Sequence, residues 1–202
     1  MKIILFGATG TIGKCVKQVL SESGHEVVSV GRNSGDHKAN IEDAASVREV
    51  YRKLISFDAV VSAVGEVTFA PLAQLTHENW TSSLNNKLLG QVNLVQEAIP
   101  FIREKGSFTL ISGILSDTPI AQGVIATAVN RAVEGFVVAA ACELPKSLRI
   151  NVVSPTMLEE AKESYGPFFP GFNPVSGRLV GEAYKKSVMG IQTGQIIKLH
   201  GA

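Results

Sequence analysis

Residues 2–13 read KIILFGATGTIG, an apolar run that passes directly into a glycine-rich turn. From residue 14 to residue 20 apolar residues recur at helical spacing, so the stretch reads as strand, turn and helix. The glycines let the backbone approach a ligand, and the helix that begins near Gly10 points unpaired N–H groups and its positive dipole end at an anion. The stretch therefore predicts a pyrophosphate site made of Gly7, Thr9, Gly10, Thr11, Ile12 and Gly13.

The composition predicts a single α/β domain over residues 1–202, because 45% hydrophobic residues supply one core and the length is short for two typical domains. The net charge is +1 and no basic run occurs, so we expect no nucleic-acid partner. Cys15 and Cys142 lie far apart in expected helices and the four histidines are scattered, which predicts neither disulfides nor a metal site. Without a signal peptide or an apolar run of membrane length, we expect a cytoplasmic protein with no membrane partner.

Short β-branched runs alternate with helical patterns along the chain, which is typical of βαβ units. We expect strands over residues 2–6, 26–30, 59–63, 107–111, 149–153 and 195–199, and helices over residues 11–23, 43–55, 79–99, 120–144 and 177–189. The predicted fold is a Rossmann-type, doubly wound parallel sheet of six to seven strands in a three-layer α/β/α arrangement. In such a sheet, ligands bind beyond the carboxyl ends of the strands.

The residues after the second expected strand bear on the choice of cofactor. Sites for NAD usually place an acidic residue there for the ribose 2′-hydroxyl, whereas a basic residue suits a 2′-phosphate. This chain has Gly31-Arg32-Asn33 with no carboxylate, and the guanidinium of Arg32 can hold phosphate bidentately. We therefore favour NADP(H) over NAD(H), with Arg32 and Asn33 among the cofactor residues. A solvated loop arginine is the alternative interpretation.

Several motifs in the same order resemble the short-chain dehydrogenase/reductase family over nearly the whole chain. Residues 7–13 are similar to its glycine motif, and residues 62–65 stand where its Asn-Asn-Ala-Gly element follows the fourth strand. Residues 149–155 are similar to the segment that ends in Pro-Gly, with Thr156 in place of the glycine, and residues 193–197 resemble the last turn and strand. The resemblance implies a dinucleotide-binding oxidoreductase and adds Ala63, Val64, Gly65 and Pro155 to the cofactor residues.

The segment over residues 33–40 is too short for the helix that family members commonly carry after the second strand. Asn40 and Ile41 then stand where the family usually has Asp-Val or Asp-Ile. The resemblance implies that Asn40 meets the adenine amino edge and that Ile41 packs on the ring. Alternatively, the pair simply begins the helix that Asp43 caps.

The resemblance does not extend to the family's catalytic tetrad of Asn, Ser, Tyr and Lys. Aligning residues 130–135 with the family's Lys-Ala-Ala-Val-Glu-Gly places Asn130 at the lysine and Ala126 at the tyrosine. Gly113 falls at the serine and Lys87 at the asparagine. Neither Ala126 nor Asn130 can transfer the proton or lower the pKa of a phenol, so reduction by the family mechanism is not expected.

Ser112, Lys87 and Tyr165 are the candidates for a replacement chemistry. In the alternative interpretation, Ser112 caps a turn, Lys87 is structural or touches the cofactor, and Tyr165 packs. The aromatic segment over residues 165–174 resembles a substrate lid by position, although it suits an interface or the core equally well.

The helix expected over residues 120–144 is apolar nearly all round, which predicts a homodimer or homotetramer. Two functions remain open. The first is an NADP(H)-dependent short-chain oxidoreductase with an altered active site and an unidentified small-molecule substrate. The second is a catalytically inactive dinucleotide-binding protein that acts as a redox sensor or a protein-interaction module.

Overall fold

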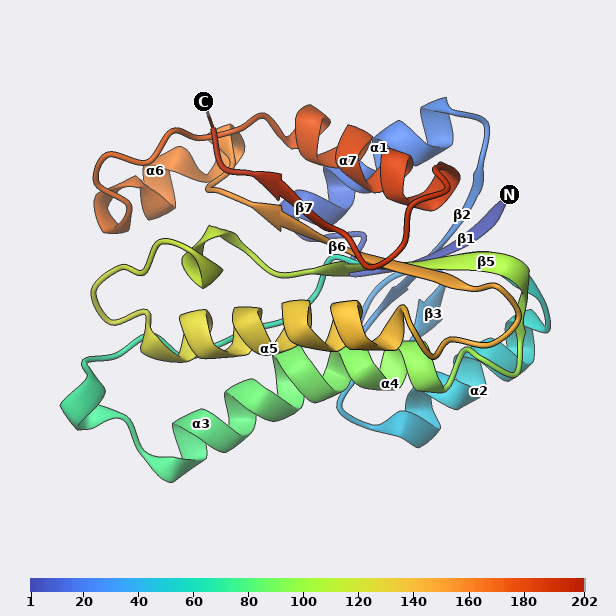
Figure 1. Ribbon diagram of the computed structural model, residues 1–202, viewed down its shortest axis with the longest axis horizontal. Helices are drawn as coiled ribbons and strands as arrows, with labels where there is room; N and C mark the ends of the chain where they lie inside the picture. Colours follow the sequence, from blue (N-terminus) through green and yellow to red (C-terminus); the bar gives the residue numbers. More distant parts are fainter. Residues whose placement is uncertain (202) are drawn as a thin grey trace.

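A seven-stranded parallel sheet runs through the computed structural model, which describes residues 1–201 (Figure 1). The strands are β1 (Lys2–Phe6), β2 (Glu26–Gly31), β3 (His37–Lys38), β4 (Phe57–Ser62), β5 (Ile102–Ile111), β6 (Arg149–Pro155) and β7 (Ile196–Leu199). Their order is β3-β2-β1-β4-β5-β6-β7, and all neighbours are parallel. The winding reverses between β1 and β4, which confirms the doubly wound sheet and puts its switch point beside the glycine turn.

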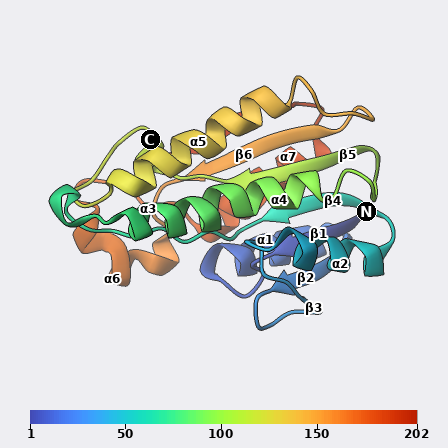
Figure 2. The same cartoon turned by 90° about the horizontal axis from the view of Figure 1, so that it is seen from below.

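Helices cover both faces of this sheet. They are α1 (Thr11–Glu22), α2 (Ala44–Leu54), α3 (His77–Ser83), α4 (Gly90–Gln96), α5 (Val124–Ala140), α6 (Lys162–Tyr165) and α7 (Gly177–Met189). Figures 1 and 2 show α1 and α7 on one face and α2, α4 and α5 on the other, which confirms the three-layer arrangement. Within residues 1–201, every helix is too short or too polar to cross a bilayer.

The alternation of side chains along β1 explains why both faces are covered. Ile4 and Phe6 pack in a core cluster with residues of α2, α4 and α5, such as Tyr51. Ile3 and Leu5 pack in a second cluster with residues of α1 and α7. Because successive strand residues point to opposite faces, a continuous apolar strand demands a helical layer on each side.

The helix expected over residues 79–99 is divided into three parts. α3 begins after Thr76, which exchanges hydrogen bonds with Asn79 in a capping box of 3.0 and 3.2 Å. Residues Leu84–Leu89 then form a π-helical turn, called the π-turn below, and α4 follows from Gly90. A single π-turn changes the apolar spacing only locally, so the sequence pattern does not reveal it.

Other element boundaries also differ from expectation. α5 is shorter than the helix expected over residues 120–144, because it begins after Gly123 and gives way to a turn at Ala141, before Pro145. Cys142 therefore lies in a turn and not in a helix. Residues 33–40 contain no helix, as the resemblance implied, but they do contain the unexpected short strand β3.

Candidate functional site

The glycine turn links β1 to α1 and presents free N–H groups. The Gly7 N–H donates to the Val30 carbonyl at 2.9 Å, and the Gly10 N–H donates to the Gly7 carbonyl at 3.0 Å. Gly10 precedes α1 in an extended conformation with no side-chain cap, and within residues 1–201 no protein acceptor binds the first-turn N–H groups of residues 11–13. These donors, together with the helix dipole, suit a bound anion.

The three glycines of the turn meet different demands. A Cβ at Gly13 would lie 1.9 Å from the Gly7 carbonyl oxygen, and one at Gly7, where φ is +85°, would lie 2.6 Å from the Ala63 carbonyl oxygen. Both positions therefore need glycine for the turn to close. A Cβ at Gly10 would meet only the Gly7 oxygen at 3.5 Å, so this residue leaves open space on the ligand side. Such a cradle fits a pyrophosphate.

A cavity of about 550 Å³ lies between this turn and the ends of β2 and β4. It brings together most of the predicted adenosine-side residues, and it is also lined by Glu66 and Asn86, which no sequence motif indicates. The predicted residues on its wall are Gly7, Gly10, Arg32, Asn33, Ile41, Ala63, Val64 and Gly65.

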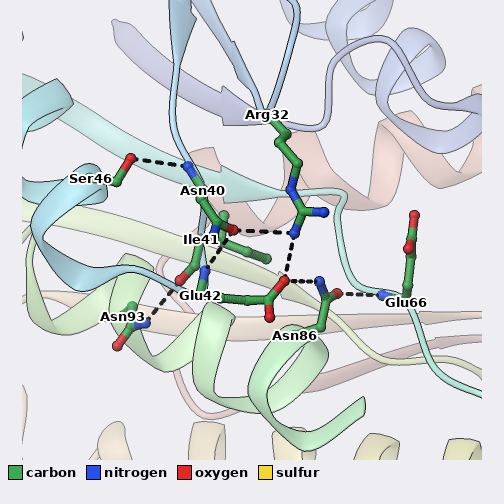
Figure 3. Close-up of polar contacts among 8 residues, drawn as sticks. All are labelled: Arg32, Asn40, Ile41, Glu42, Ser46, Glu66, Asn86 and Asn93. Carbon is green, nitrogen blue, oxygen red and sulfur yellow. Dashed lines mark hydrogen bonds and ion pairs between the residues drawn. The ribbon is translucent and has the colours of Figure 1, made fainter. Parts of the chain in front are cut away.

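Arg32 is held in a polar network at the edge of this cavity (Figure 3). Its Nη2 donates to Glu42 Oε1 at 2.6 Å and to Asn40 Oδ1 at 3.2 Å. Asn86 Nδ2 donates to the same Glu42 oxygen at 2.8 Å, and the Glu66 N–H donates to Asn86 Oδ1 at 2.7 Å. Arg32 is therefore ion-paired within its loop, while more than half of its side chain stays exposed.

Asn40 and Ile41 occupy the stretch between β3 and α2. The Asn40 N–H donates to the Ser46 hydroxyl at 3.1 Å, and Ile41 is buried on the cavity wall. Asp43 then caps α2 by accepting a 2.9 Å hydrogen bond from the Ala45 N–H. Ile41 is available to a ring in the cavity, while Asp43 has the capping role predicted for it.

A second cavity of about 580 Å³ extends from the start of α1 toward an apolar wall. It shares Ala63, Gly65 and Glu66 with the first cavity, so the two meet at the end of β4. Thr11, Ile12 and Pro155, predicted as cofactor residues, line this second cavity. Thr9 lines neither cavity; its hydroxyl lies 3.3 Å from that of Ser34.

The second cavity also gathers every residue considered for chemistry. The candidates Lys87, Ser112 and Tyr165 line it. So do Gly113, Ala126 and Asn130, the positions aligned with the family's serine, tyrosine and lysine. The remaining wall is largely apolar and consists of residues such as Val67, Phe69, Ile114, Leu115, Met157, Leu158 and Phe169.

Lys87 lies in the π-turn, and its side chain is partly buried. Its Nζ donates to the Ser112 carbonyl oxygen at 3.5 Å. Burial lowers the pKa of the Lys87 ammonium to about 8, because desolvation disfavours the charged form. Gly65, at a φ of +134°, makes room for the lysine stem, since a Cβ there would lie 2.6 Å from Lys87 Cγ.

Ser112 lines the second cavity, but its hydroxyl is engaged within the protein. Its hydroxyl donates to Glu134 Oε1 at 2.9 Å, and Glu134 is only 2% exposed. The other Glu134 oxygen lies 3.8 Å from Arg131, which pairs with Asp117 at 2.8 Å. The Ser112 hydrogen is thus committed to a buried carboxylate, in keeping with a structural role.

Tyr165 stands on the rim of the second cavity and is 57% exposed. The aromatic segment around it is anchored at both ends. A bridge joins Leu158 to Val175, and both Glu160 carboxylate oxygens accept from the Gly177 N–H at 2.9 and 3.0 Å. Phe169 contacts a small core cluster around Ile114, so the segment both forms cavity wall and packs on the core.

Within residues 1–201, no three His, Cys, Asp or Glu side chains gather closely enough to hold a metal ion. The candidate site consists of a glycine cradle, two joined cavities and the polar groups around them. A parallel α/β sheet with such a cradle at its switch point defines a nucleotide-binding protein of the Rossmann class.

Comparison with known proteins identifies the family to which this chain belongs. The family model described as "Enoyl-(Acyl carrier protein) reductase" matches residues 7–173, and the chain belongs to the short-chain dehydrogenase/reductase family of oxidoreductases. Proteins of this family bind a nicotinamide dinucleotide, and the free N–H groups and open face at Gly10 fit its pyrophosphate.

Two curated relatives are similar over part of their length. The chain is 27% identical over 167 residues to 3-ketodihydrosphingosine reductase of Bacteroides thetaiotaomicron, covering 76% of this chain and 62% of the relative. It is 24% identical over 160 residues to the 3-oxoacyl-(acyl-carrier-protein) reductase of Thermotoga maritima, covering 76% of this chain and 65% of that protein. The chain thus spans less than two thirds of either relative.

Two solved structures are similar along almost the whole chain. The protein lin1944 from Listeria innocua is 45% identical, with a TM-score of 0.95 and 98% of both chains covered. A small-chain dehydrogenase in complex with NADPH is 21% identical, with a TM-score of 0.88 over 98% of this chain and 96% of that one. The latter likeness is one of fold.

Proposed function

We propose that this protein is an NADP(H)-dependent oxidoreductase that acts on an apolar carbonyl compound and uses Lys87 as its proton donor. The observation that carries the proposal is the meeting of two cavities at the end of β4. One cavity lies against the glycine cradle, and the other combines an apolar wall with the partly buried Lys87.

The residues around the first cavity support the choice of NADP(H). The first-turn N–H groups of α1 would hold the pyrophosphate, and Arg32 with Asn33 would hold a 2′-phosphate, because no carboxylate stands directly at the end of β2. Asn40 and Ile41 would meet the adenine. Ala63, Val64 and Gly65 would support the middle of the dinucleotide, and Thr11, Ile12 and Pro155 would face its nicotinamide half. When bound, the nicotinamide supplies the hydride.

Lys87 supplies the proton in this proposal. As the substrate carbonyl carbon gains a hydride, its oxygen gains negative charge, and the Lys87 ammonium donates a proton there to complete the alcohol. A pKa of about 8 keeps Lys87 protonated at neutral pH while making the proton easier to release. The Ser112 carbonyl orients the ammonium, and the neutral amine regains its proton from solvent through the open cavity.

The apolar wall argues for the substrate class. Phe69, Ile114 and Phe169 would bury a hydrophobic body and exclude water, which strengthens the attraction between the ammonium and a developing oxyanion. Because the wall around the Lys87 ammonium is largely apolar, a compact apolar ketone, enone or quinone fits better than a sugar.

A nucleotide-binding protein without turnover is the second candidate function. It is favoured by Ala126, a buried methyl on the cavity wall, and by the engagement of the Ser112 hydroxyl with Glu134. Under this alternative, Lys87 would only support the loop after β4. A sensor or an interaction module would bind the dinucleotide but oxidise none of it.

Calorimetry with NADPH and NADH tests the first step, and we expect micromolar binding of NADPH. A screen of NADPH oxidation with apolar ketones, enones and quinones tests the second. Lys87→Met should abolish any turnover found while leaving NADPH binding within twofold, and Lys186→Met, at an exposed lysine of α7, should change neither. Binding without turnover across the screen would favour the sensor, and absence of binding would contradict both functions.

We further propose that α5 pairs with a second copy in a homodimer or homotetramer. Val124 and Val138 on this helix are 38% and 49% exposed, although the helix covers the sheet with its other side. Sedimentation at micromolar concentration should then show no monomer. A monomer alone would contradict the pairing.

A further inference from the structure

We propose that Glu42 weakens the preference for NADPH over NADH, by occupying the guanidinium of Arg32 that a 2′-phosphate would need. This inference rests on the proposed dinucleotide site. Figure 3 shows the Glu42 carboxylate between Arg32 and Asn86, and the ion pair to Arg32 measures 2.6 Å. Glu42 comes ten residues after Arg32, beyond the strand end at which sequence motifs for cofactor choice are read.

The hydrogen bonds of Arg32 leave no free fork for a phosphate. A guanidinium can grip an oxyanion bidentately through Nε with Nη2, or through Nη1 with Nη2, so both grips use Nη2. In this structure, Nη2 donates to Glu42 and to Asn40, which engages its two hydrogens. Arg48 in the same chain shows the unobstructed grip, with Nε and Nη2 on the two oxygens of Glu97 at 2.5 and 2.9 Å.

Glu42 is fixed in this position from two sides. Its backbone N–H donates to Asn40 Oδ1 at 3.3 Å, and its Oε1 accepts from Asn86 Nδ2 as well as from Arg32. Asn86 belongs to the π-turn and is itself held by the Glu66 N–H. Glu42 therefore stays near Arg32 even when that arginine turns to another anion.

Two effects of Glu42 follow for the two cofactors. A 2′-phosphate must displace the Glu42 carboxylate from Nη2 and then remain beside its negative charge, and both requirements weaken binding. A ribose 2′-hydroxyl carries no charge and needs no fork, so NADH leaves the pair intact. The Glu42 carboxylate thus lowers the affinity for NADPH relative to NADH below the ratio that Arg32 alone would give.

The test measures dissociation constants of NADPH and NADH for the natural protein and for Glu42→Gln. The variant keeps the size of the side chain and an acceptor for Asn86, but it removes the charge. We expect NADPH to bind about tenfold more tightly, a change of about 1.4 kcal/mol, and NADH to change less than twofold. Adenosine 2′,5′-bisphosphate should bind the variant more tightly, as NADPH does, whereas the affinity for ADP should not change. This difference would place the effect at the 2′-phosphate.

Glu49→Gln is the matched control, because Glu49 forms an exposed ion pair with Arg52 on α2 and lines neither cavity. It should leave all four dissociation constants unchanged. An unchanged or weakened affinity of Glu42→Gln for NADPH would overturn the role of Glu42 while leaving the proposed function intact. If the natural protein bound neither dinucleotide, the proposed function itself would fail.

Discussion

The Ser112 hydroxyl donates a 2.9 Å hydrogen bond to the buried carboxylate of Glu134. Replacing Ser112 therefore distinguishes a structural role of this hydroxyl from a catalytic one. Ser112→Ala leaves the Glu134 oxygen without its donor. We expect the free energy of unfolding to fall by about 1–3 kcal/mol, since a buried polar group loses its partner. Urea unfolding measures this loss, with the exposed Ser21→Ala on α1 as a control within about 0.5 kcal/mol.

The same variant also tests whether Ser112 takes part in catalysis. With its hydrogen bond directed at Glu134, Ser112→Ala should leave kcat for NADPH oxidation within twofold at a temperature where the variant is folded. A loss of kcat by a hundredfold or more at unchanged KM would show that the hydroxyl acts on the substrate.

Lys87 should lower the free energy of unfolding of the protein at neutral pH. Because burial lowers the pKa of its ammonium to about 8, the folded state disfavours the charged form relative to the unfolded chain. The penalty is fully present below pH 8, decreases as the pH rises toward the unfolded pKa near 10.4, and then vanishes. Lys87→Met should therefore raise the free energy of unfolding at pH 7 by on the order of 2 kcal/mol.

That gain should shrink as the pH rises from 8 to about 10, which urea unfolding across this range measures. Lys186→Met, at an exposed lysine, should give no such trend. A pH-independent difference between Lys87→Met and the natural protein would instead indicate a simple packing effect.

Gly10 and Gly13 should differ sharply when replaced by alanine. At Gly13 the new Cβ would lie 1.9 Å from the Gly7 carbonyl oxygen, so Gly13→Ala should destabilise the fold by about 3 kcal/mol or more. At Gly10 the backbone conformation suits alanine and the space is open, so Gly10→Ala should fold normally but weaken NADPH binding at least tenfold.

Gly135→Ala is the matched control for these two variants. Gly135 lies within α5, and a Cβ there would meet nothing within 4 Å. The variant should gain about 0.5–1 kcal/mol in stability from helix propensity and leave NADPH affinity unchanged. Normal NADPH binding by Gly10→Ala would contradict the placement of the pyrophosphate.

Tyr165 offers the one phenol on the second cavity within residues 1–201, which makes Tyr165→Phe informative. Because the side chain is 57% exposed on the rim, we expect kcat to stay within twofold. A large loss of kcat with normal NADPH binding would indicate that this phenol, and not Lys87, donates the proton.

The sheet and its ligand edge were predictable, because the strand pattern and the glycine turn are local. The apolar run of β1 and the spacing of Gly7, Gly10 and Gly13 stand together within residues 2–13, although the clash that requires glycine at position 7 is with Ala63. The short strand β3 was not predictable, since two residues carry no period of their own.

The polar network around Arg32 also could not be predicted from the sequence. Glu42 reaches Arg32 across ten positions and Asn86 across forty-four, and only the folded chain brings these side chains together. The role of Ser112 likewise depends on Glu134, twenty-two residues away on α5. Lys87 was identified by its alignment with the family tetrad, whereas the π-turn that carries it left no mark in the apolar pattern.

The pH dependence of kcat for NADPH oxidation tests whether Lys87 donates the proton, once a carbonyl substrate has been found in the screen. If Lys87 donates the proton, kcat should be constant near neutrality and fall tenfold for each pH unit above about 8. Lys87→Arg, whose guanidinium stays charged and does not release its proton, should lose this turnover as Lys87→Met does. A kcat of the natural enzyme that stays constant up to pH 9.5 would exclude Lys87 as the proton donor, and NADPH binding with no turnover of any ketone, enone or quinone tested would exclude the oxidoreductase.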